Sequence, residues 1–499
     1  MMHFRFSRCR SLYFRGLLGI AGAPLFGCLM LPAPVLAADG DVPGLATHSL
    51  TKLNTDLVDD ISRRSFRYFW DQTDPRTGLA LDRALNDGED QEKQGQERVA
   101  SVAATGFGLT AYCIAAEHRW ISRETARQRV LTALRFLADE APNEHGWFYH
   151  FMDSATGKRA WRSEISSIDT ALLLAGVLTS RQFFRDDLEI NRLATLIYER
   201  VDFPWMMDGS LLYFSHGWTP ERGFLRYRWD TYSELLILYT LGIGSPTHPI
   251  SPDTWDTWKL PMVGVEGHMY VGGGPLFIHQ FSQAWLDLRD RFPAPQQPAD
   301  SIVLPSDSGS SSYRVNYFAN SIAATRAQRE LFSKDLSRQF PGYTSKVWGV
   351  TASDSANGYT NWEASPAGSR IDGTVVPSAA AGSLMFTPDI CIPAMRAMLV
   401  KYGKKIYGRY GFTDAFNPNT GWTSQYVIGI DVGITLLSAE NLRTGNVWQW
   451  FMSNPETEYA LDAVGLKKLH PSPDHDPLLV LQPSQTLMRY NLSPGTLAK

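Results

Sequence analysis

The sequence predicts an all-α fold, a single (α/α)6 toroid in which six helical hairpins close on themselves. Three observations support this prediction. Helical periodicity recurs along the chain while strand-like alternation is scarce, and the links between helices alternate in length. The hairpins near the N-terminus begin about 65 to 70 residues apart, so about 400 residues hold six of them.

The expected helices show apolar positions that repeat with a period near 3.6 residues. Two segments, Ala171–Ala175 and Leu235–Tyr239, are apolar throughout, as helices of an inner ring covered by an outer ring would be. The expected helices are Leu53–Asp71, Val99–Glu117, Arg123–Asp139, Ile165–Phe184, Leu188–Val201, Thr231–Leu241, Phe277–Arg289, Val315–Gln339, Pro377–Leu384, Pro388–Tyr402 and Gly433–Phe451.

Long loops separate the hairpins and are expected to form a cleft at one end of the toroid. Three links, at residues 74–98, 140–164 and 202–230, each run to about 25 residues, whereas the links within hairpins have about four. Strict alternation places every long link at the same end. Loops of this length in a folded domain are usually functional.

The N-terminal residues 1–37 have the pattern of a secretory signal peptide, with four arginines, an apolar run and an Ala-rich cleavage site after Ala37. Export to the periplasm is therefore expected. Cys28 ends a sequence that resembles a lipobox, which leaves an outer-membrane lipoprotein as the alternative. Residues 38–453 are expected to form one catalytic domain, and the Pro-rich residues 454–499 an irregular extension.

Composition excludes several classes of protein. The signal peptide carries four of the 47 basic residues and none of the 51 acidic ones, so the mature chain is acidic and unsuited to nucleic acid. Neither metal-ligand spacing nor a cofactor motif is present, and we predict no metal and no cofactor. Cys113 and Cys391 lie in apolar helical contexts and are expected as buried thiols. A monomer without a stable membrane span is expected.

Carboxylates near the starts of helices are the candidates for catalysis. Glycoside hydrolysis needs one carboxylic acid and one carboxylate. Glu234 opens an expected inner helix that Asp230 already caps, so burial beside apolar residues should raise its pKa toward that of a general acid. Asp431 and Asp414 are the candidate bases, with helix capping as the alternative role of Asp431. Asp169 fits a capping box with Ser166 equally well.

Eight of the 15 tryptophans fall in or beside long loops, together with carboxylates, arginines and histidine. Sugar rings stack on aromatic planes while their hydroxyl groups need polar partners, so this mixture favours a neutral polysaccharide. These tryptophans are Trp147, Trp161, Trp205, Trp218, Trp229, Trp348, Trp362 and Trp422.

With these features in place, the chain resembles the glucoamylase-like (glycoamylase) domain family, whose characterised members include bacterial endo-β-1,2-glucanases of glycoside hydrolase family 144. The matching stretches span about residues 60 to 453. They are Phe69-Trp70, Gly78-Leu79, Asp82-Arg83, Ala103–Leu109, Trp161–Gly176, Leu241–Pro249, Ile278–Gln280, Trp348–Asp354, Asp372–Thr374, Gly382–Leu384, Phe386–Pro388, Tyr410–Phe412, Asp414–Pro418, Gly429–Asp431, Glu440-Asn441 and Arg443–Gly445.

The resemblance implies an (α/α)6 barrel and inverting hydrolysis of β-1,2-glucan, with Glu234 as the acid and Asp431 or Asp414 as the base. Two departures bear on substrate contact and on the base: Ser233 stands where the family usually has Asn, and Val432 where it often has Gln. The residues expected to contact substrate are Asp82, Arg83, Asp153, Trp161, Glu164, Asp169, His216, Trp229, Tyr232, His279, Trp362 and Asp372.

Two other functions remain open. A glycan-binding or scaffold protein would keep the toroid without turnover, which the two departures permit. A polysaccharide lyase could use Tyr232 or His279 as its base, although an acidic chain is poorly suited to anionic polymers. The residues do not determine the linkage, the chain length of the substrate, endo or exo action, or bound calcium.

Overall fold

The computed structural model describes residues 51–89, 98–293, 315–362 and 371–468, all of which belong to one structural unit that starts at Leu50. The predicted signal peptide (1–37), Cys28 and residues 469–499 of the predicted extension lie outside the described residues. Within the described residues, no helix combines the length and the apolar character needed to cross a membrane.

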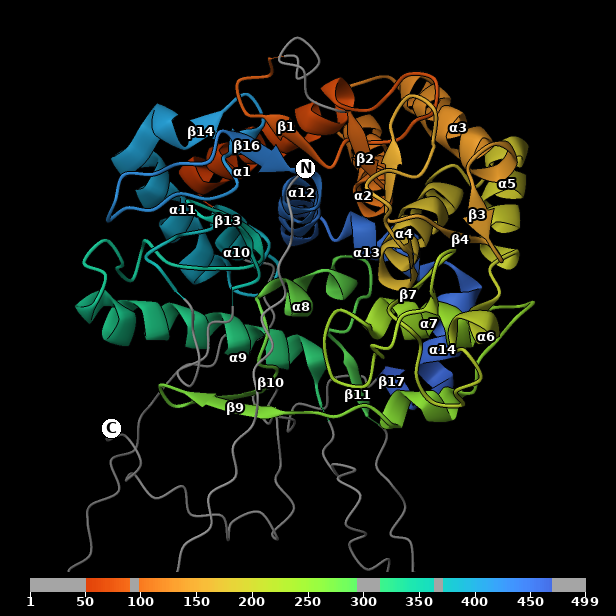
Figure 1. The fold of residues 1–499 in the computed structure, drawn as a ribbon. Coiled ribbons are helices and arrows are strands. Elements are labelled where there is room, and N and C mark those ends of the chain that lie inside the picture. Colours follow the sequence, from red (N-terminus) through yellow and green to blue (C-terminus); the bar gives the residue numbers. More distant parts are fainter. Residues whose placement is uncertain (1–50, 90–97, 294–314, 363–370, 469–499) are drawn as a thin grey trace, which may run out of the picture. The chain divides into compact units, whose positions relative to one another are not determined.

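Helices account for most of the regular structure (Figure 1). Short turns of 3-10 or π helix are η2 (Pro252–Asp256), η3 (Ser282–Ala284), η4 (Leu331–Asp335), η5 (Leu336–Arg338) and η6 (Gly403–Lys405). The α-helices are α1 (Lys52–Asp71), α2 (Val102–Glu117), α3 (Arg123–Asp139), α4 (Ser167–Phe183), α5 (Leu188–Glu199), α6 (Phe203–Met206), α7 (Leu236–Gly244), α8 (Phe277–Gln280), α9 (Tyr317–Glu330), α10 (Pro377–Ala381), α11 (Pro388–Tyr402), α12 (Gly429–Arg443), α13 (Asn446–Met452) and α14 (Pro455–Ala463).

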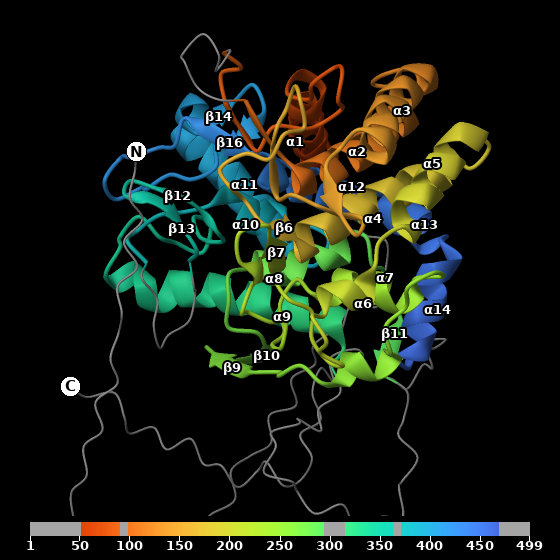
Figure 2. The same cartoon turned by 45° about the vertical axis from the view of Figure 1, so that its right-hand side comes forward.

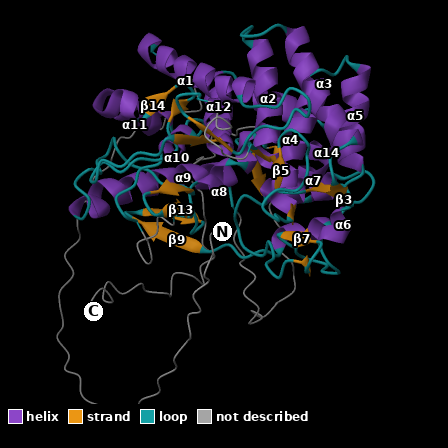
Figure 3. Cartoon of the chain, turned by 45° about the horizontal axis from the view of Figure 1, so that its top comes forward, coloured by secondary structure: helices purple, strands orange, loops and turns teal. Residues whose placement is uncertain are grey.

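The strands are short and lie among the loops (Figure 3). They form ribbons of two or three strands, so the prediction of a mainly helical fold is confirmed. The strands are β1 (Arg83–Leu85), β2 (Val99–Ser101), β3 (Asn143–Glu144), β4 (Trp147–Phe148), β5 (Phe151–Asp153), β6 (Ile165–Ser166), β7 (Gly217–Thr219), β8 (Gly223–Phe224), β9 (Met262–Val265), β10 (His268–Val271), β11 (Arg291–Pro293), β12 (Ser353–Ser355), β13 (Gly358–Thr360), β14 (Tyr407–Gly408), β15 (Gly411–Phe412), β16 (Tyr426–Ile428) and β17 (Leu466–Lys468).

The most apolar helices lie at the centre of the packing. Helix α2 contacts α4 on one side and α12 on the other, α4 continues to α7, and α12 continues to α10. Helices α1, α3 and α5 pack against this inner set and carry polar faces (Figure 2). Burial of nearly every residue of α2 and α4 supplies the main hydrophobic driving force for this unit.

Helices α2 and α4 meet at two glycines. A Cβ atom on Gly176 would lie 2.1 Å from the carbonyl oxygen of Gly106, and one on Gly106 would lie 2.2 Å from the carbonyl oxygen of Leu172. Only glycine permits this backbone approach. The contact fixes the middle of α4 relative to α2.

Strand pairing joins the long loops to one another. Strand β2 in the first long loop pairs with β5 in the second, and β6 at the end of the second pairs with β7 in the third. Strand β1 of the first loop pairs with β16, which leads into α12. The prediction that the long loops gather at the same end of the helices is therefore confirmed.

Several predicted helix boundaries were wrong. The helix expected from Thr231 begins at Leu236, since Tyr232 and Asp230 are held by a backbone connection to Lys259 instead. The helix expected over 277–289 breaks into α8 and η3, and that over 433–451 divides at Gly445, which adopts a left-handed conformation. Strands β2 and β6 stand at Val99 and Ile165, where two helices were predicted to begin.

The folded unit extends beyond the predicted boundary at residue 453. Helix α14 packs against α7, and the buried Arg291 donates to the carbonyl oxygen of Leu466 and to the carboxylate of Glu458. Residues 455–468 therefore belong to the fold rather than to an irregular extension. Cys113 and Cys391 are free and buried, as predicted.

We predict that Gly176→Ala destabilises the protein by about 3 kcal/mol in urea unfolding, because the new methyl group overlaps the backbone of α2. This loss exceeds the gain of about 1 kcal/mol that alanine brings to a helix. Gly274→Ala is the matched control, since its Cβ would make ordinary contacts at 3.4 Å with Ile278. Equal stability of the two variants would contradict the prediction.

Candidate active site

An arginine joins two carboxylates from distant parts of the chain. Arg83 at the start of β1 donates from Nε to Asp82 Oδ2 at 3.2 Å, and from one terminal nitrogen to Asp354 Oδ1, also at 3.2 Å. Ser424 donates to the other oxygen of Asp354 at 3.0 Å. Hydrogen bonds between ionised groups are stronger than neutral ones, so Arg83 holds the first long loop against strand β12.

Asp414 and Asp431 form an acid pair beside this arginine. Their carboxyl groups lie within hydrogen-bonding distance, which requires a shared proton. The backbone N–H of Asp354 donates to Asp414 Oδ2 at 2.7 Å. Burial, followed by the charge of Asp431, raises the pKa of Asp414 well above its usual range, whereas burial raises the pKa of Asp431 to about 6.

The start of α12 positions Asp431. Strand β16 pairs with β1, and the N–H of Gly429 donates to the carbonyl oxygen of Asp82 at 2.7 Å. Asp431 was expected before the helix, as a possible cap, but it lies inside the first turn and Ile428 is the N-cap residue. The positive end of the helix dipole favours a carboxylate there.

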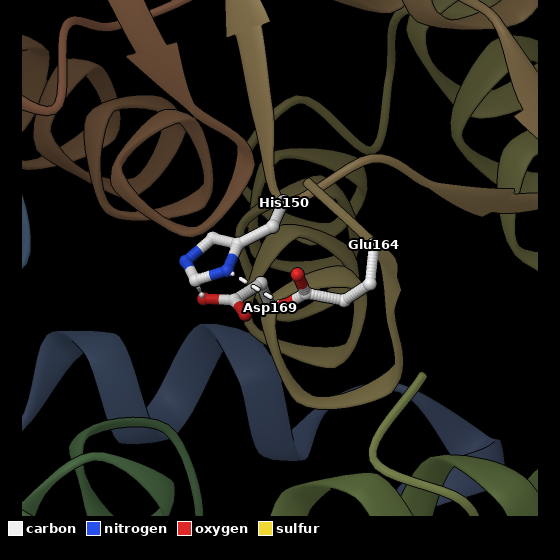
Figure 4. Close-up of side chains that lie close together, drawn as sticks. All are labelled: His150, Glu164 and Asp169. Carbon is white, nitrogen blue, oxygen red and sulfur yellow. Dashed lines mark hydrogen bonds and ion pairs between the residues drawn. The ribbon is translucent and has the colours of Figure 1, made fainter. Parts of the chain in front are cut away.

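His150 bridges two further carboxylates (Figure 4). Its Nδ1 lies 2.9 Å from Glu164 Oε1, and its Nε2 lies 3.5 Å from Asp169 Oδ1. Burial lowers the pKa of His150, but the charges of Asp169 and Glu164 outweigh this effect and raise it to about 9. His150 is therefore an imidazolium at neutral pH, and the three side chains form an ion triad.

The triad also has the donor set of a metal site. Its three ligand atoms lie within 4.8 Å of one another. A divalent ion would need the imidazole lone pair, so binding must release the proton of His150. The carboxylates of Glu164 and Asp169, which would bind the metal, also stabilise the proton on His150. Without a bound metal, the ion triad is the form expected near pH 7.

Glu234 lies in a turn two residues before α7, not in the helix as predicted. The hydroxyl group of Ser282 donates to its carbonyl oxygen and fixes the turn. Asp230 does not cap the helix but pairs with Lys259 at 2.8 Å. Burial raises the pKa of Glu234 to about 7, and the charge of Asp169 acts in the same direction. The group is therefore able to hold a proton near neutrality.

Asp82 connects the two groups of carboxyls. Its charge raises the pKa of Asp169 and of His150 on one side, and that of Asp431 on the other. The site also contains Tyr359, on the β12–β13 hairpin, whose side chain is 54% exposed and lies within electrostatic reach of Asp82 and both members of the acid pair. These side chains form the carboxylate site, defined as Asp82, Arg83, His150, Glu164, Asp169, Glu234, Asp354, Tyr359, Asp414 and Asp431.

Several predicted contact residues have structural partners instead. Asp153 and Asp372 accept hydrogen bonds within their own turns, from Thr156 and Thr374. Their carboxylates thus stabilise loops, and the structure does not bring them to the ion pairs of the carboxylate site.

Several aromatic residues that were predicted to contact substrate pack against other side chains, because large rings in loops can fold back into the core. His216 stacks on the buried Trp229 at 4.0 Å between ring centroids, and the buried Tyr232 contacts His279 at 3.2 Å. Burial lowers the pKa of His279 to about 3. Of the eight loop tryptophans, Trp147, Trp348 and Trp362 are buried as well. Trp161 is 56% exposed and packs on Phe151 beside His150.

Sequence reasoning missed His150, Asp354 and Tyr359. His150 occurs in the same long loop as Glu164, so a histidine among loop carboxylates was an available signal. Asp354 ends a stretch already noted for its resemblance, but nothing in its spacing predicts the contact with Arg83, which is 271 positions away. Tyr359 carries no distinguishing pattern in the sequence.

We predict that His150→Asn removes a pH-dependent part of the stability. A histidine whose folded pKa is raised stabilises the protein fully below about pH 6.5, and this stabilisation is lost as the pH rises to about 9. The free energy of unfolding should fall by up to about 3 kcal/mol more in the wild type than in the variant over this range. Urea titrations would measure the difference. His248→Asn, on the surface, is the control. Parallel profiles for His150→Asn and wild type would contradict the prediction.

Comparison with known proteins finds a family model and a relative to which the chain is similar. The family model Glycoamylase (Putative glucoamylase) matches residues 226–455. An exo β-1,2-glucooligosaccharide sophorohydrolase (non-reducing end) from Parabacteroides distasonis is 27% identical over 466 residues, covering 85% of this chain. The chain spans 60% of the length of that relative.

Solved structures give the same result. An endo-β-1,2-glucanase from Chitinophaga pinensis, in complex with sophorotriose and glucose, has 27% identity and a TM-score of 0.73 over 85% of this chain and 100% of that one. A β-1,2-glucanase from Parabacteroides distasonis has 26% identity and a TM-score of 0.72, over 83% of this chain and 60% of that one. By sequence the chain is similar to the Glycoamylase family, and by fold it is similar to these β-1,2-glucanases.

Proposed function

We propose that this protein is a glycoside hydrolase that cleaves β-1,2-linked glucan by an acid–base mechanism. The proposal rests on one observation: two carboxyl groups of the same site, Glu234 and Asp431, differ in protonation near neutral pH. Burial keeps Glu234 protonated up to about pH 7, whereas Asp431 is ionised above about pH 6. Glycoside hydrolysis needs one carboxyl group in each state.

Each carboxyl group has a role in this proposal. Glu234 protonates the departing glycosidic oxygen, because it is the acid of the site that retains its proton near neutrality without help from a paired carboxyl. Asp431 accepts the proton of the attacking water. Asp414 hydrogen-bonds to Asp431 and carries the shared proton, so it modulates the base instead of acting as one.

The substrate class comes from the relatives. The Chitinophaga protein is an endo-β-1,2-glucanase and the Parabacteroides protein an exo-acting sophorohydrolase, so β-1,2-glucan is common to both. Endo action with inversion is the form we propose here. Trp161 and Tyr359 are exposed aromatic rings at the carboxylate site on which sugar rings could stack.

We also infer that the helices form an (α/α)6 toroid. Support comes from the inner helices, whose contacts follow one another from α10 to α12, α2, α4, α7 and η3, while Gln280 at the end of α8 donates to Ser383 just beyond α10. Helices α1, α3, α5, α9 and α11 alternate with these along the chain.

We predict that Glu234→Gln lowers kcat on β-1,2-glucan by about 10³-fold, because the amide cannot protonate the leaving oxygen. Binding of the same glucan should change little, since the side chain keeps its size and polarity. Product release measured by chromatography and binding by calorimetry would give the two values. Glu140→Gln removes an exposed carboxylate from an ion pair with Arg76 and is the control.

Two results would contradict the proposal. Wild-type protein that binds β-1,2-glucan without releasing products would favour a non-catalytic glycan-binding protein. Wild-type protein that acts on another glucan would retain the hydrolase and replace the linkage.

We predict a bell-shaped pH dependence of kcat/KM, with its maximum between about pH 6 and pH 7. Activity should rise as Asp431 loses its proton near pH 6 and fall as Glu234 loses its proton near pH 7. Initial rates at subsaturating glucan measured from pH 4 to pH 9 test this. The prediction is wrong if the rate continues to increase above pH 8.

A further inference from the structure

A small cavity lies behind the acid pair, between helices α1, α10 and α12. Its volume is about 20 Å³. Apolar walls come from Ile61, Ala381 and Val432, whereas Ser378 and the two carboxyl groups of the acid pair supply polar atoms. Every one of these side chains is buried, so the cavity belongs to the interior of the protein.

Three polar atoms of the residues around this cavity make no direct hydrogen bond within the described part of the chain. They are Ser378 Oγ, Asp414 Oδ1 and Asp431 Oδ2. A shared proton between the carboxyls uses one lone pair on each oxygen and leaves others free. Ser378 is only 7% exposed, and its hydroxyl group lies close enough to Asp431 to lower the pKa of that carboxyl group.

Buried polar groups that lack a partner are costly, and most of them in proteins are satisfied by protein groups or ordered water. A cavity that holds one water needs roughly 10–15 Å³ and two to four polar partners. The cavity meets both conditions. We propose that it binds a single internal water molecule, which accepts a hydrogen bond from Ser378 and donates to the carboxyl groups of Asp414 and Asp431.

This water would make Ser378 a positioning residue for the acid pair. Hydrogen bonds donated to a carboxylate favour its ionised form. The water therefore stabilises Asp431 as a carboxylate while Asp414 retains the shared proton. The other charged or titratable groups near the pair are Asp82, Arg83, Asp354 and Tyr359, which lie on β1 and on the β12–β13 hairpin. The consequence for catalysis rests on the proposed function, but the water site does not.

The test uses the full chain and three variants. Ser378→Val fills the cavity and removes the hydroxyl group, and Ser378→Ala removes the hydroxyl group alone. Ser62→Ala is the matched control, since Ser62 is equally buried on α1 but donates to the carbonyl oxygen of Val58. A crystal structure at about 1.2 Å should show one water-sized peak in wild type, hydrogen-bonded to Ser378, that is missing from Ser378→Val.

Unfolding measured against pH provides a readout that needs no activity. Loss of the water should raise the pKa of the acid pair, so the deficit of Ser378→Val in urea midpoint should be larger at pH 8 than at pH 5. The deficit of Ser62→Ala should stay constant. Ser378→Ala, which leaves room for the water, should show a smaller change in the same direction. If the enzyme is active, the acidic limb of kcat/KM should move up by about one pH unit in Ser378→Val, a roughly tenfold loss at pH 5.

The possible results distinguish failure of the water site from failure of the proposed function. A cavity without a peak, or a peak with the short contacts of a bound cation, overturns the water site. So does a Ser378→Val deficit that is independent of pH. A protein that shows the water and the pH-dependent deficit but cleaves no glucan retains the water site and loses the proposed function.

Discussion

The arrangement of the carboxylate site follows from one electrostatic constraint, the burial of seven carboxyl groups in a small volume. Charged groups are costly inside a protein unless they are paired or protonated. Arg83 pairs with both Asp82 and Asp354, and His150 pairs with both Glu164 and Asp169, so each cation offsets one of two negative charges. For Glu234 and the acid pair, protons offset the remaining charge. The same charge balance leaves Glu234 as a carboxyl group that can hold a proton near neutrality.

The cations have a second role, because they hold segments that are distant in sequence. Arg83 ties the first long loop to β12, and His150 ties the second long loop to the start of α4. The same helix α4 is held against α2 farther along by the glycine contact. Electrostatic pairing and close helix packing therefore determine the same geometry. Substitution of a residue in an ion pair or in the helix contact can therefore change the protonation of the site, even where that residue does not contact a substrate.

Much of the fold could be predicted from the sequence, because helical periodicity and loop length are local properties. α1, α3 and α11 begin and end within a residue or so of the predicted positions. The start of α7 could not be predicted, since the backbone pairing of Tyr232 with Lys259 prevents the helix from beginning earlier. In the site, residue type and context predict Glu234, Asp431 and Asp414 as candidates, and their catalytic roles stay predictions. The aromatic contacts were less predictable, because Trp348 and Trp362 fold into the core whereas Trp161 does not. Contacts such as Arg83 with Asp354 depend on tertiary structure alone.

The hydrogen-bonded pairs β1–β16, β2–β5 and β6–β7 carry a consequence for how such a protein diversifies. Each loop of the site is joined to the next by backbone hydrogen bonds between their strands. A change in the length of one loop therefore displaces the loop beside it. Exchange of a single loop between homologues would disrupt its strand pairing with the neighbouring loop. Exchange of two adjacent loops together would preserve that pairing. Recombination and engineering should therefore succeed in units of paired loops, and new specificities should arise from coordinated replacement of neighbours.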